Sequence, residues 1–201
     1  MTTLREPMDI GTSTNAHRNE RALVTSGPAR KALAVLRIAF GLTFLWAFFD
    51  KLLALGFSTG AVTNAAGAKT GIDFFSKDAW IHGGNPTLGF LKFGATGPLK
   101  GFYNSIAGEA WVNWAFMLGL LFIGLTLTLG IAIRLGAAAG FVMYLMMWSV
   151  ALLPQTNPLI DDHILGAATM VVLGLTLAGD TWGLGKSWSR QHLVADTAVL
   201  G

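Results

Sequence analysis

The sequence predicts an all-α membrane protein, a bundle of four transmembrane helices with a long external loop between the first and second helices. Of 201 residues, 53% are hydrophobic and only 12% are charged, whereas a soluble domain carries about 25% charged residues. Four apolar stretches reach the roughly 20 residues that a helix needs to cross a bilayer. They are about 32–55, 111–131, 135–153 and 163–182. A soluble helical protein would need polar helix faces that these stretches lack.

The distribution of lysine and arginine predicts that both termini lie on the cytoplasmic side of the cell membrane. Basic residues flank the ends of the spans that would face the cytoplasm: Arg30, Lys31, Arg134, Lys186 and Arg190. The connection before the fourth span contains none. We therefore expect a flexible cytoplasmic tail over 1–30, a membrane domain over 31–185 and a cytoplasmic tail over 186–201. Residues 1–30 lack the apolar core of a signal peptide.

The predicted external loop, residues 57–109, is far longer than the 2 to 8 residues that usually connect helices in a bundle. It mixes aromatic residues with glycines and lysines, which favours a segment lying on the outer membrane surface. We expect residues 80–93 to cover the outer opening of the bundle, held by Trp80, Phe90 and Phe93. A loop without a functional role is the alternative.

Two opposite charges lie side by side in WAFFDKLL, near the outer end of the first span. They are Asp50 and Lys51, and Asp161, Asp162 and His163 open the fourth span at the same predicted level. Ionisable residues at membrane depth usually face the bundle interior and mark a functional site. We therefore expect Asp50, Asp162 and His163 to be catalytic and Lys51 to bind substrate. Alternatively, Lys51 reaches the interface, and Asp161 or Asp162 caps the fourth helix.

Two further cations are candidates for binding an anionic substrate. His82 lies in the external loop, where the backbone amides of Gly83 and Gly84 are additional donors. Arg37 precedes Lys51 by 14 residues, close to four helical turns, so the two share a helix face. Arg37 alternatively reaches phosphates of the inner leaflet.

Several kinds of site are not indicated. The chain has no cysteine, which excludes disulfides and thiolate metal ligands, and its 4 histidines are too scattered to predict a metal site. The basic residues form no stripe with interleaved aromatics, so nucleic-acid binding is not expected. The GAAAG pattern at 136–140 indicates a close helix–helix contact.

The order of residues in the first span, Arg37-x3-Gly41-x4-Trp46-x4-Lys51, resembles the DoxX-like membrane proteins. Three other stretches look more specifically like the DoxD group: WIHGGNPT at 80–87, GLTLTLGIAIR at 124–134 and NPLIDDH at 157–163. The resemblance spans about 31–185 and depends on order and spacing together.

The resemblance implies a four-helix membrane bundle. The DoxD group is the large subunit of thiosulfate:quinone oxidoreductase, which oxidises thiosulfate to tetrathionate and passes the electrons to membrane quinone. A histidine with a carboxylate suits proton delivery to quinone. Because a DoxA-type region is not recognisable here, the resemblance implies a separate partner subunit, and a homo-oligomer is a further option. The alternative is a non-catalytic scaffold or anchor for a redox complex. A small transporter is disfavoured because the sequence has no internal repeat.

Overall fold

The computed structural model describes residues 24–154, 157, 159–191 and 194. It is mostly helical, and its longest helices are α2 (Gly27–Leu53), α4 (Ala110–Leu129), α5 (Ile133–Val150) and α6 (Asp162–Leu175). Within the described part of the chain, α2, α4 and α5 are long and apolar enough to cross a membrane. The fourth, α6, is an apolar helix of 14 residues. A membrane protein is therefore indicated.

The predicted tails fall mainly outside the described residues. In the tail expected over 1–30, the structure describes residues from 24 onward, and α2 begins at Gly27 with Pro28 in its first turn. Proline is favoured there because its missing N–H has no helical partner to lose. Of the tail expected over 186–201, residues 186–191 and 194 are described, and they include most of the short helix α7 (Gly185–Trp188).

The long helices pack mainly in pairs, α2 with α4 and α5 with α6, and α4 also contacts α5. Small residues allow this approach. A Cβ added to Gly41 of α2 would lie 2.4 Å from the side-chain oxygen of Thr128, and one on Gly136 of α5 would lie 2.1 Å from that of Thr126. A Cβ on Gly140 would lie 2.8 Å from the sulfur of Met170 on α6. The predicted contact at GAAAG is confirmed, and its two glycines contact different helices.

The core lies where these helices meet, and the outer faces are also apolar. Phe44, Met117, Met143 and Met170, from α2, α4, α5 and α6 respectively, are buried together. On the opposite faces large hydrophobic side chains are exposed, among them Leu42, Leu118, Val142 and Val172. Helices that are apolar all round are typical of membrane spans.

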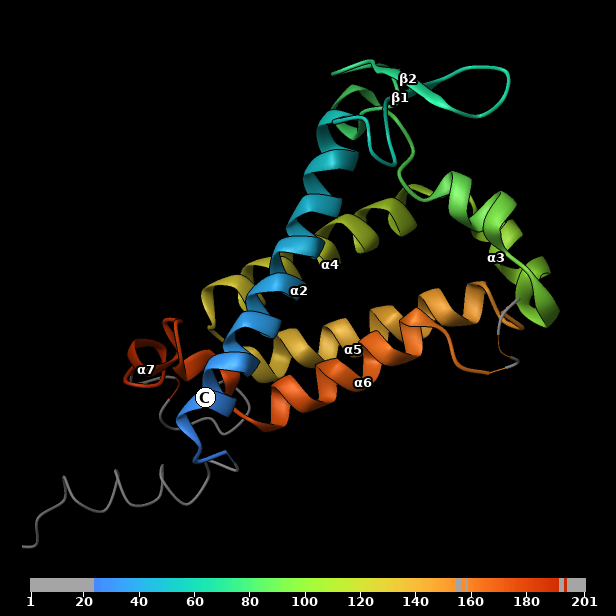
Figure 1. Cartoon of the computed structure of the whole chain (residues 1–201). Coiled ribbons are helices and arrows are strands. Elements are labelled where there is room, and N and C mark those ends of the chain that lie inside the picture. Colours follow the sequence, from blue (N-terminus) through green and yellow to red (C-terminus); the bar gives the residue numbers. More distant parts are fainter. Residues whose placement is uncertain (1–23, 155–156, 158, 192–193, 195–201) are drawn as a thin grey trace, which may run out of the picture.

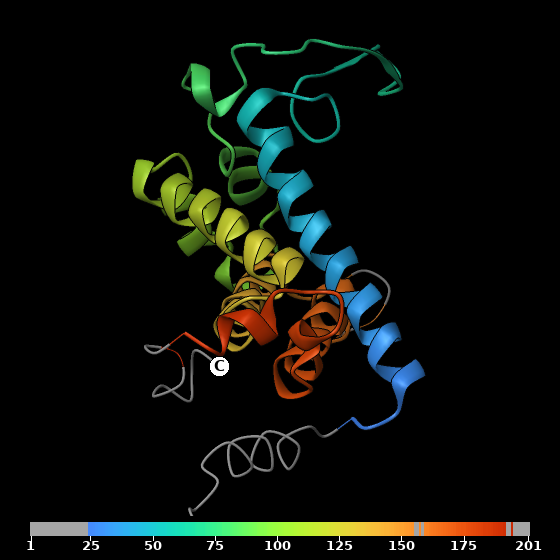
Figure 2. The same ribbon diagram turned by 90° about the vertical axis from the view of Figure 1, so that its left-hand side faces the viewer.

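The connecting segment, residues 54–109, contains more regular structure than the predicted loop. Strands β1 (Ala61–Thr63) and β2 (Lys69–Ile72) form an antiparallel hairpin that the sequence analysis did not predict. Short turns η1 (Trp80–His82), η2 (Phe90–Gly94) and η3 (Gly97–Leu99) and the helix α3 (Lys100–Ile106) follow. In both ribbon views this segment lies at one end of the helices, while α7 and the start of α2 lie at the other (Figures 1 and 2).

The backbone carbonyls in the last turn of α4 accept hydrogen bonds from groups in three segments of the chain. Its final carbonyls have no partner within the helix. Gly130 N–H donates to Thr126 O at 2.9 Å, and Leu184 N–H donates to Leu129 O at 2.8 Å. The carbonyls between them, Leu127 O and Thr128 O, both accept from Nη1 of Arg37.

Arg37 joins α2 to this turn and to the chain that follows α6. Its Nη2 donates to Trp182 O at 3.0 Å and to Thr181 O at 3.4 Å, and its side chain has no exposed surface. Carbonyls at a helix C-terminus carry partial negative charge, which favours a cation there. Arg37 therefore holds α2, α4 and residues 181–182 together.

The predicted fourth span, about 163–182, is wrong at its end. Helix α6 stops at Leu175, Leu177 adopts a left-handed backbone with φ of 49°, and η4 (Ala178–Asp180) follows. Outside a helix, the carbonyls of Thr181 and Trp182 are free to point at Arg37. This tertiary contact is absent from the local hydrophobic pattern, which continues without interruption through residue 179.

The Arg37 contacts predict that Arg37→Leu destabilises the protein by about 3 kcal/mol or more, because hydrogen bonds to charged groups contribute about 1.5–3 kcal/mol each and the buried carbonyls would be left unpaired. Thermal unfolding in detergent micelles is the measurement. Lys31→Leu, an exposed cation near the start of the same helix, is the matched control. Equal midpoints for the two variants would contradict the role assigned to Arg37.

Candidate functional site

Asp50 lies at the end of α2, where its carboxylate closes the turn that follows the helix. The carboxylate accepts from the backbone N–H of Phe57 at 2.9 Å, of Ser58 at 2.9 Å and of Thr59 at 3.1 Å, and from the Ser58 hydroxyl at 2.5 Å. Only 1% of Asp50 is exposed. A buried carboxylate needs such donors. In this arrangement Asp50 holds the backbone of residues 57–59.

Lys51 points in a different direction from Asp50, because neighbouring side chains on a helix lie about 100° apart, but the two residues share Ser58 as a partner. The Nζ of Lys51 donates to Ser58 Oγ at 2.9 Å, and Ser58 Oγ in turn donates to Asp50 Oδ2. Nζ also lies 6.0 Å from the centre of the Phe116 ring. Lys51 is half-buried, and it lines a large cavity.

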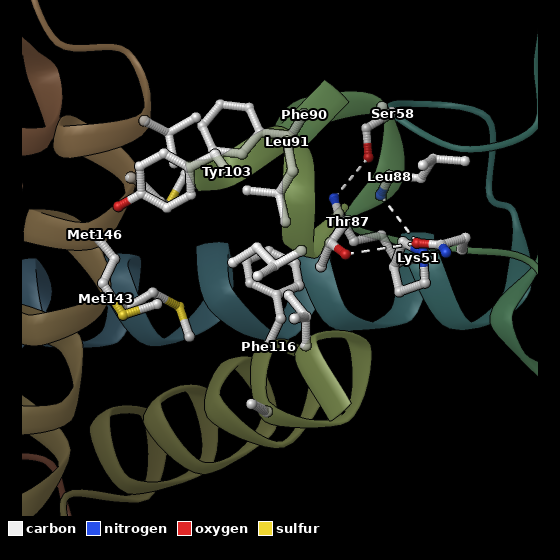
Figure 3. A pocket seen from close by; sticks show the side chains of 18 of the residues that line it. Lys51, Ser58, Thr87, Leu88, Phe90, Leu91, Tyr103, Phe116, Met143 and Met146 are labelled. Carbon is white, nitrogen blue, oxygen red and sulfur yellow. Dashed lines mark hydrogen bonds between the residues drawn. The ribbon is translucent and has the colours of Figure 1, made fainter. Parts of the chain in front are cut away.

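The cavity has a volume of about 1340 Å³ and lies between the connecting segment, α4 and α5. Its walls are mainly apolar. Figure 3 shows Phe90, Leu91, Tyr103 and Phe116 around it, with Met143 and Met146 at one end and Lys51 and Ser58 toward the other. An apolar cavity with a few polar groups is the usual form of a small-molecule site. This cavity, with Lys51, is the candidate functional site.

Polar side chains fix the connecting segment over the cavity, and the sequence analysis did not single them out. Thr87 donates through its hydroxyl to Asn113 Oδ1 of α4 at 2.7 Å, and both residues are buried. The Tyr103 hydroxyl lies 2.5 Å from Ser149 Oγ of α5. An asparagine in an apolar span was the available signal for Asn113, since a buried polar group requires a partner.

The anchors expected over residues 80–93 are correct only in part. Trp80 packs edge-on against Trp114 of α4, with 4.7 Å between ring centres. Phe90 and Phe93 line the cavity, but Phe93 is 83% exposed, and the buried side chain of this turn is Leu91. Leu91, and not Phe93, therefore anchors it.

His163 lies at the start of α6, beside a different carboxylate from the ones expected. Its Nδ1 lies 2.8 Å from Oδ2 of Asp161, whereas Asp162 is exposed. Asp161 also caps α6, because its Oδ1 accepts from the N–H of His163 and of Ile164. The capping alternative for Asp161 is confirmed, and the carboxylate that orients His163 is Asp161 rather than Asp162 or Asp50.

The position of His163 separates it from Asp50. Its ring lies 6.4 Å from that of Tyr144, and the Tyr144 ring contacts Phe40 and Phe44 of α2 at 6.2 and 5.5 Å. Asp50 lies 6 residues beyond Phe44, roughly 9 Å farther along the helix. Through Tyr144, His163 is thus placed beside the part of α2 that carries Phe40 and Phe44, and among the described residues no hydrogen bond or ion pair joins it to Asp50 or Lys51.

The other two predicted binding residues also lie apart from the cavity. His82 is exposed in η1, and its Nδ1 lies 3.2 Å from Ser76 O. The amides of Gly83 and Gly84 already donate to Trp80 O and Ala79 O, so they are not free to bind an anion. Arg37 is 14 residues from Lys51, roughly 21 Å along α2, and it binds backbone carbonyls. Of the predicted site residues, Lys51 alone lines the cavity.

The described ranges contain no cluster of metal ligands. No three His, Asp or Glu side chains there are grouped closely enough to hold an ion. Comparisons with protein-family models, curated proteins and solved structures found no match for this chain. The resemblance to the DoxD group therefore depends on the quoted sequence motifs alone.

The environment of Asp161 makes its contribution to stability dependent on pH. Burial raises the pKa of Asp161, but hydrogen bonds from His163 and from Ile164 N–H outweigh burial and leave the pKa below its ordinary value. A lowered pKa in the folded state means that the ionised carboxylate stabilises the fold above the ordinary pKa. This stabilisation is lost as pH falls through the lowered pKa.

Asp161→Ala is expected to cost about 1 kcal/mol at neutral pH, the usual value of an N-cap. The difference from wild type should shrink as the pH falls below about 4, the ordinary pKa of aspartate. Thermal unfolding at pH 7 and pH 3 measures both effects, and Asp162→Ala is the matched control with an exposed side chain. A larger loss for Asp162→Ala would contradict the assignment of the cap.

Proposed function

We propose that α2, α4, α5 and α6 form a four-helix bundle in the cell membrane, with α7 and the start of α2 in the cytoplasm and the connecting segment outside. At about 1.5 Å per residue, the 14 residues of α6 extend roughly 21 Å, less than a hydrocarbon core of about 30 Å. The turn through η4 continues the fourth crossing. Arg30, Lys31 and Lys186 lie on elements at the same end of the helices, which supports a cytoplasmic location for that end.

Because the chain has no cysteine, single cysteines test this topology directly. In intact cells a membrane-impermeant maleimide is expected to label Ala65→Cys in the β1–β2 hairpin but not Lys186→Cys in α7. Permeabilised cells should label both, which controls for accessibility. Labelling of Lys186→Cys in intact cells would contradict the orientation.

For the activity, we propose that the chain is a membrane oxidoreductase subunit of the DoxD type that binds quinone in the cavity. The supporting observation is the apolar cavity with the Lys51 ammonium at its polar end. A quinone is apolar and carries two carbonyl oxygens, so it needs apolar walls and a donor. The donor at this end is Lys51 Nζ, which stays in place through Ser58.

In this proposal electrons come from thiosulfate at the outer face. Two thiosulfate ions join through a new sulfur–sulfur bond to form one tetrathionate and release two electrons. Quinone takes up these two electrons with two protons and becomes quinol. Lys51 attracts the anion or hydrogen-bonds the quinone oxygen, and a DoxA-like or other partner subunit completes the outer site.

A scaffold without catalytic activity is the second candidate, and one observation favours it. Asp50 and Arg37, both predicted to belong to the reaction site, bind the protein's own backbone. In a scaffold the cavity would hold a lipid or a quinone without turnover. The two candidates differ in one measurable property, which is thiosulfate-dependent reduction of quinone by the purified chain.

Lys51→Met is expected to reduce quinone reduction at least about tenfold, because a hydrogen bond to a charged group contributes about 1.5–3 kcal/mol. Activity is measured as thiosulfate-dependent reduction of a short-chain quinone in proteoliposomes, with quinone binding measured separately. Lys77→Met, an exposed lysine that does not line the cavity, is the matched control. Quinone binding by wild type without reduction would favour the scaffold, and absence of both would reject the quinone site.

A further inference from the structure

Residues 90–102 form an exposed apolar stretch within the connecting segment. This stretch contains η2, η3 and the start of α3, and it is called the aromatic stretch below. Phe93 is 83% exposed and Phe102 is 58% exposed, and Leu99 is exposed as well. Burial of side chains of this size away from water is strongly favourable. So many of them on one short stretch indicate a surface that is covered in the native setting.

The charges of the aromatic stretch are of one sign. Lys92 and Lys100 are exposed, and the sequence from residue 79 to residue 108 contains no aspartate or glutamate. Within the part of the chain that the structure describes, neither lysine has an ion-pair partner. Apolar side chains with neighbouring lysines are the composition of segments that lie in the interface of an anionic membrane.

The aromatic stretch is fixed beside the end of a membrane helix. Thr96 N–H donates to Val150 O at 2.9 Å, and the Thr96 hydroxyl donates to Leu152 O at 3.1 Å. Val150 is the last residue of α5, so these bonds place the stretch beside that end of the helix. In the four-helix arrangement proposed above, this end of α5 lies at the depth of the lipid headgroups.

The aromatic stretch is also one wall of the cavity. Phe90 and Phe93 line it on one side, and Val142 and Met146 of α5 line it on another. Val142 and Met146 are themselves exposed, on a helix whose outer face is apolar. If lipid covers both walls, the cavity opens sideways into the bilayer.

We propose that the aromatic stretch is inserted in the membrane interface, with Phe93 and Phe102 among acyl chains and Lys92 and Lys100 on the phosphates of anionic lipids. The cavity then receives its ligand from the lipid phase. This inference requires the membrane spans but not electron transfer, so loss of the proposed enzyme activity would leave it standing.

Insertion is tested with a dye on single cysteines in the otherwise cysteine-free chain, reconstituted in phosphatidylcholine vesicles with about one third phosphatidylglycerol. Dyes at Phe93→Cys and Phe102→Cys should be quenched by a nitroxide on lipid acyl chains and protected from aqueous iodide. Ala65→Cys, in the exposed turn of the hairpin, should behave in the opposite way. Iodide quenching at Phe93→Cys equal to that at Ala65→Cys would overturn the proposal.

Lipid selectivity is tested by placing the acyl nitroxide on phosphatidylglycerol or on phosphatidylcholine. Stronger quenching of the Phe93→Cys dye by labelled phosphatidylglycerol is expected, and Lys92→Gln with Lys100→Gln should remove that difference. Lys69→Gln with Lys77→Gln is the matched control. Selectivity that survives the Lys92 and Lys100 changes would overturn the headgroup contact. Self-quenching of the dye at high dilution in lipid would show that a second copy of the chain covers the stretch, and would also overturn the proposal.

Discussion

The buried guanidinium of Arg37 determines how the helices are joined at the end that carries α7 and the start of α2. Among the described residues, Arg37 is the donor to two carbonyls of the last turn of α4 and to those of residues 181–182, and unpaired backbone groups are costly where water is excluded. The surrounding glycines follow from the same constraint. A Cβ on Gly130 would lie 2.9 Å from Nη1, and one on Gly183 would lie 3.1 Å from Nη2. The early end of α6 is a further consequence, since helical carbonyls at 181–182 would be directed along the axis.

At the opposite end of the helices, side chains of the connecting segment join the helix ends, and this arrangement leaves room for the cavity. Hydrogen bonds from the connecting segment join the helix ends, through Thr87 to Asn113 and through Tyr103 to Ser149. Figure 1 shows α2 and α5 running in clearly different directions, with the connecting segment between their ends. Because the connecting segment is attached by only a few polar contacts, it bridges the helices without filling the space between them. The resulting space keeps an apolar lining, because its walls are helix faces with a membrane composition.

Composition and hydropathy were sufficient to predict the first three long helices, because an apolar run of about 20 residues favours a helix of membrane-spanning length. The first three spans were predicted to within about five residues at each end. Two features leave too little signal in the local sequence to be predicted from it. The β1–β2 hairpin depends on a short turn in which Asn64 Oδ1 accepts from Ala66 and Ala68 N–H, and such a turn gives little signal in a glycine-rich segment. The charged residues were assumed to meet because they share a predicted depth. Depth does not determine which helices are neighbours, and α2 packs mainly on α4 whereas α6 packs on α5.

Asp50 and Lys51, the adjacent charges of α2, have different roles. This difference limits the chemistry available in the cavity, because only Lys51 lines it. Asp50 is fully engaged by the turn, so it is a poor proton donor to any ligand. Among the residues that line the cavity, the titratable side chains are Lys51, Asp78 and Tyr103, and the Tyr103 hydroxyl is hydrogen-bonded to Ser149.

A quinone reduced in the cavity needs two protons. His163 is near Tyr144 and Asp161 and does not line the cavity. One proton would therefore come from Lys51, and the second from water that reaches Lys51 through the exposed Ser58. The same geometry suits a scaffold that only holds an apolar molecule, because Lys51 can orient a polar head without any proton transfer.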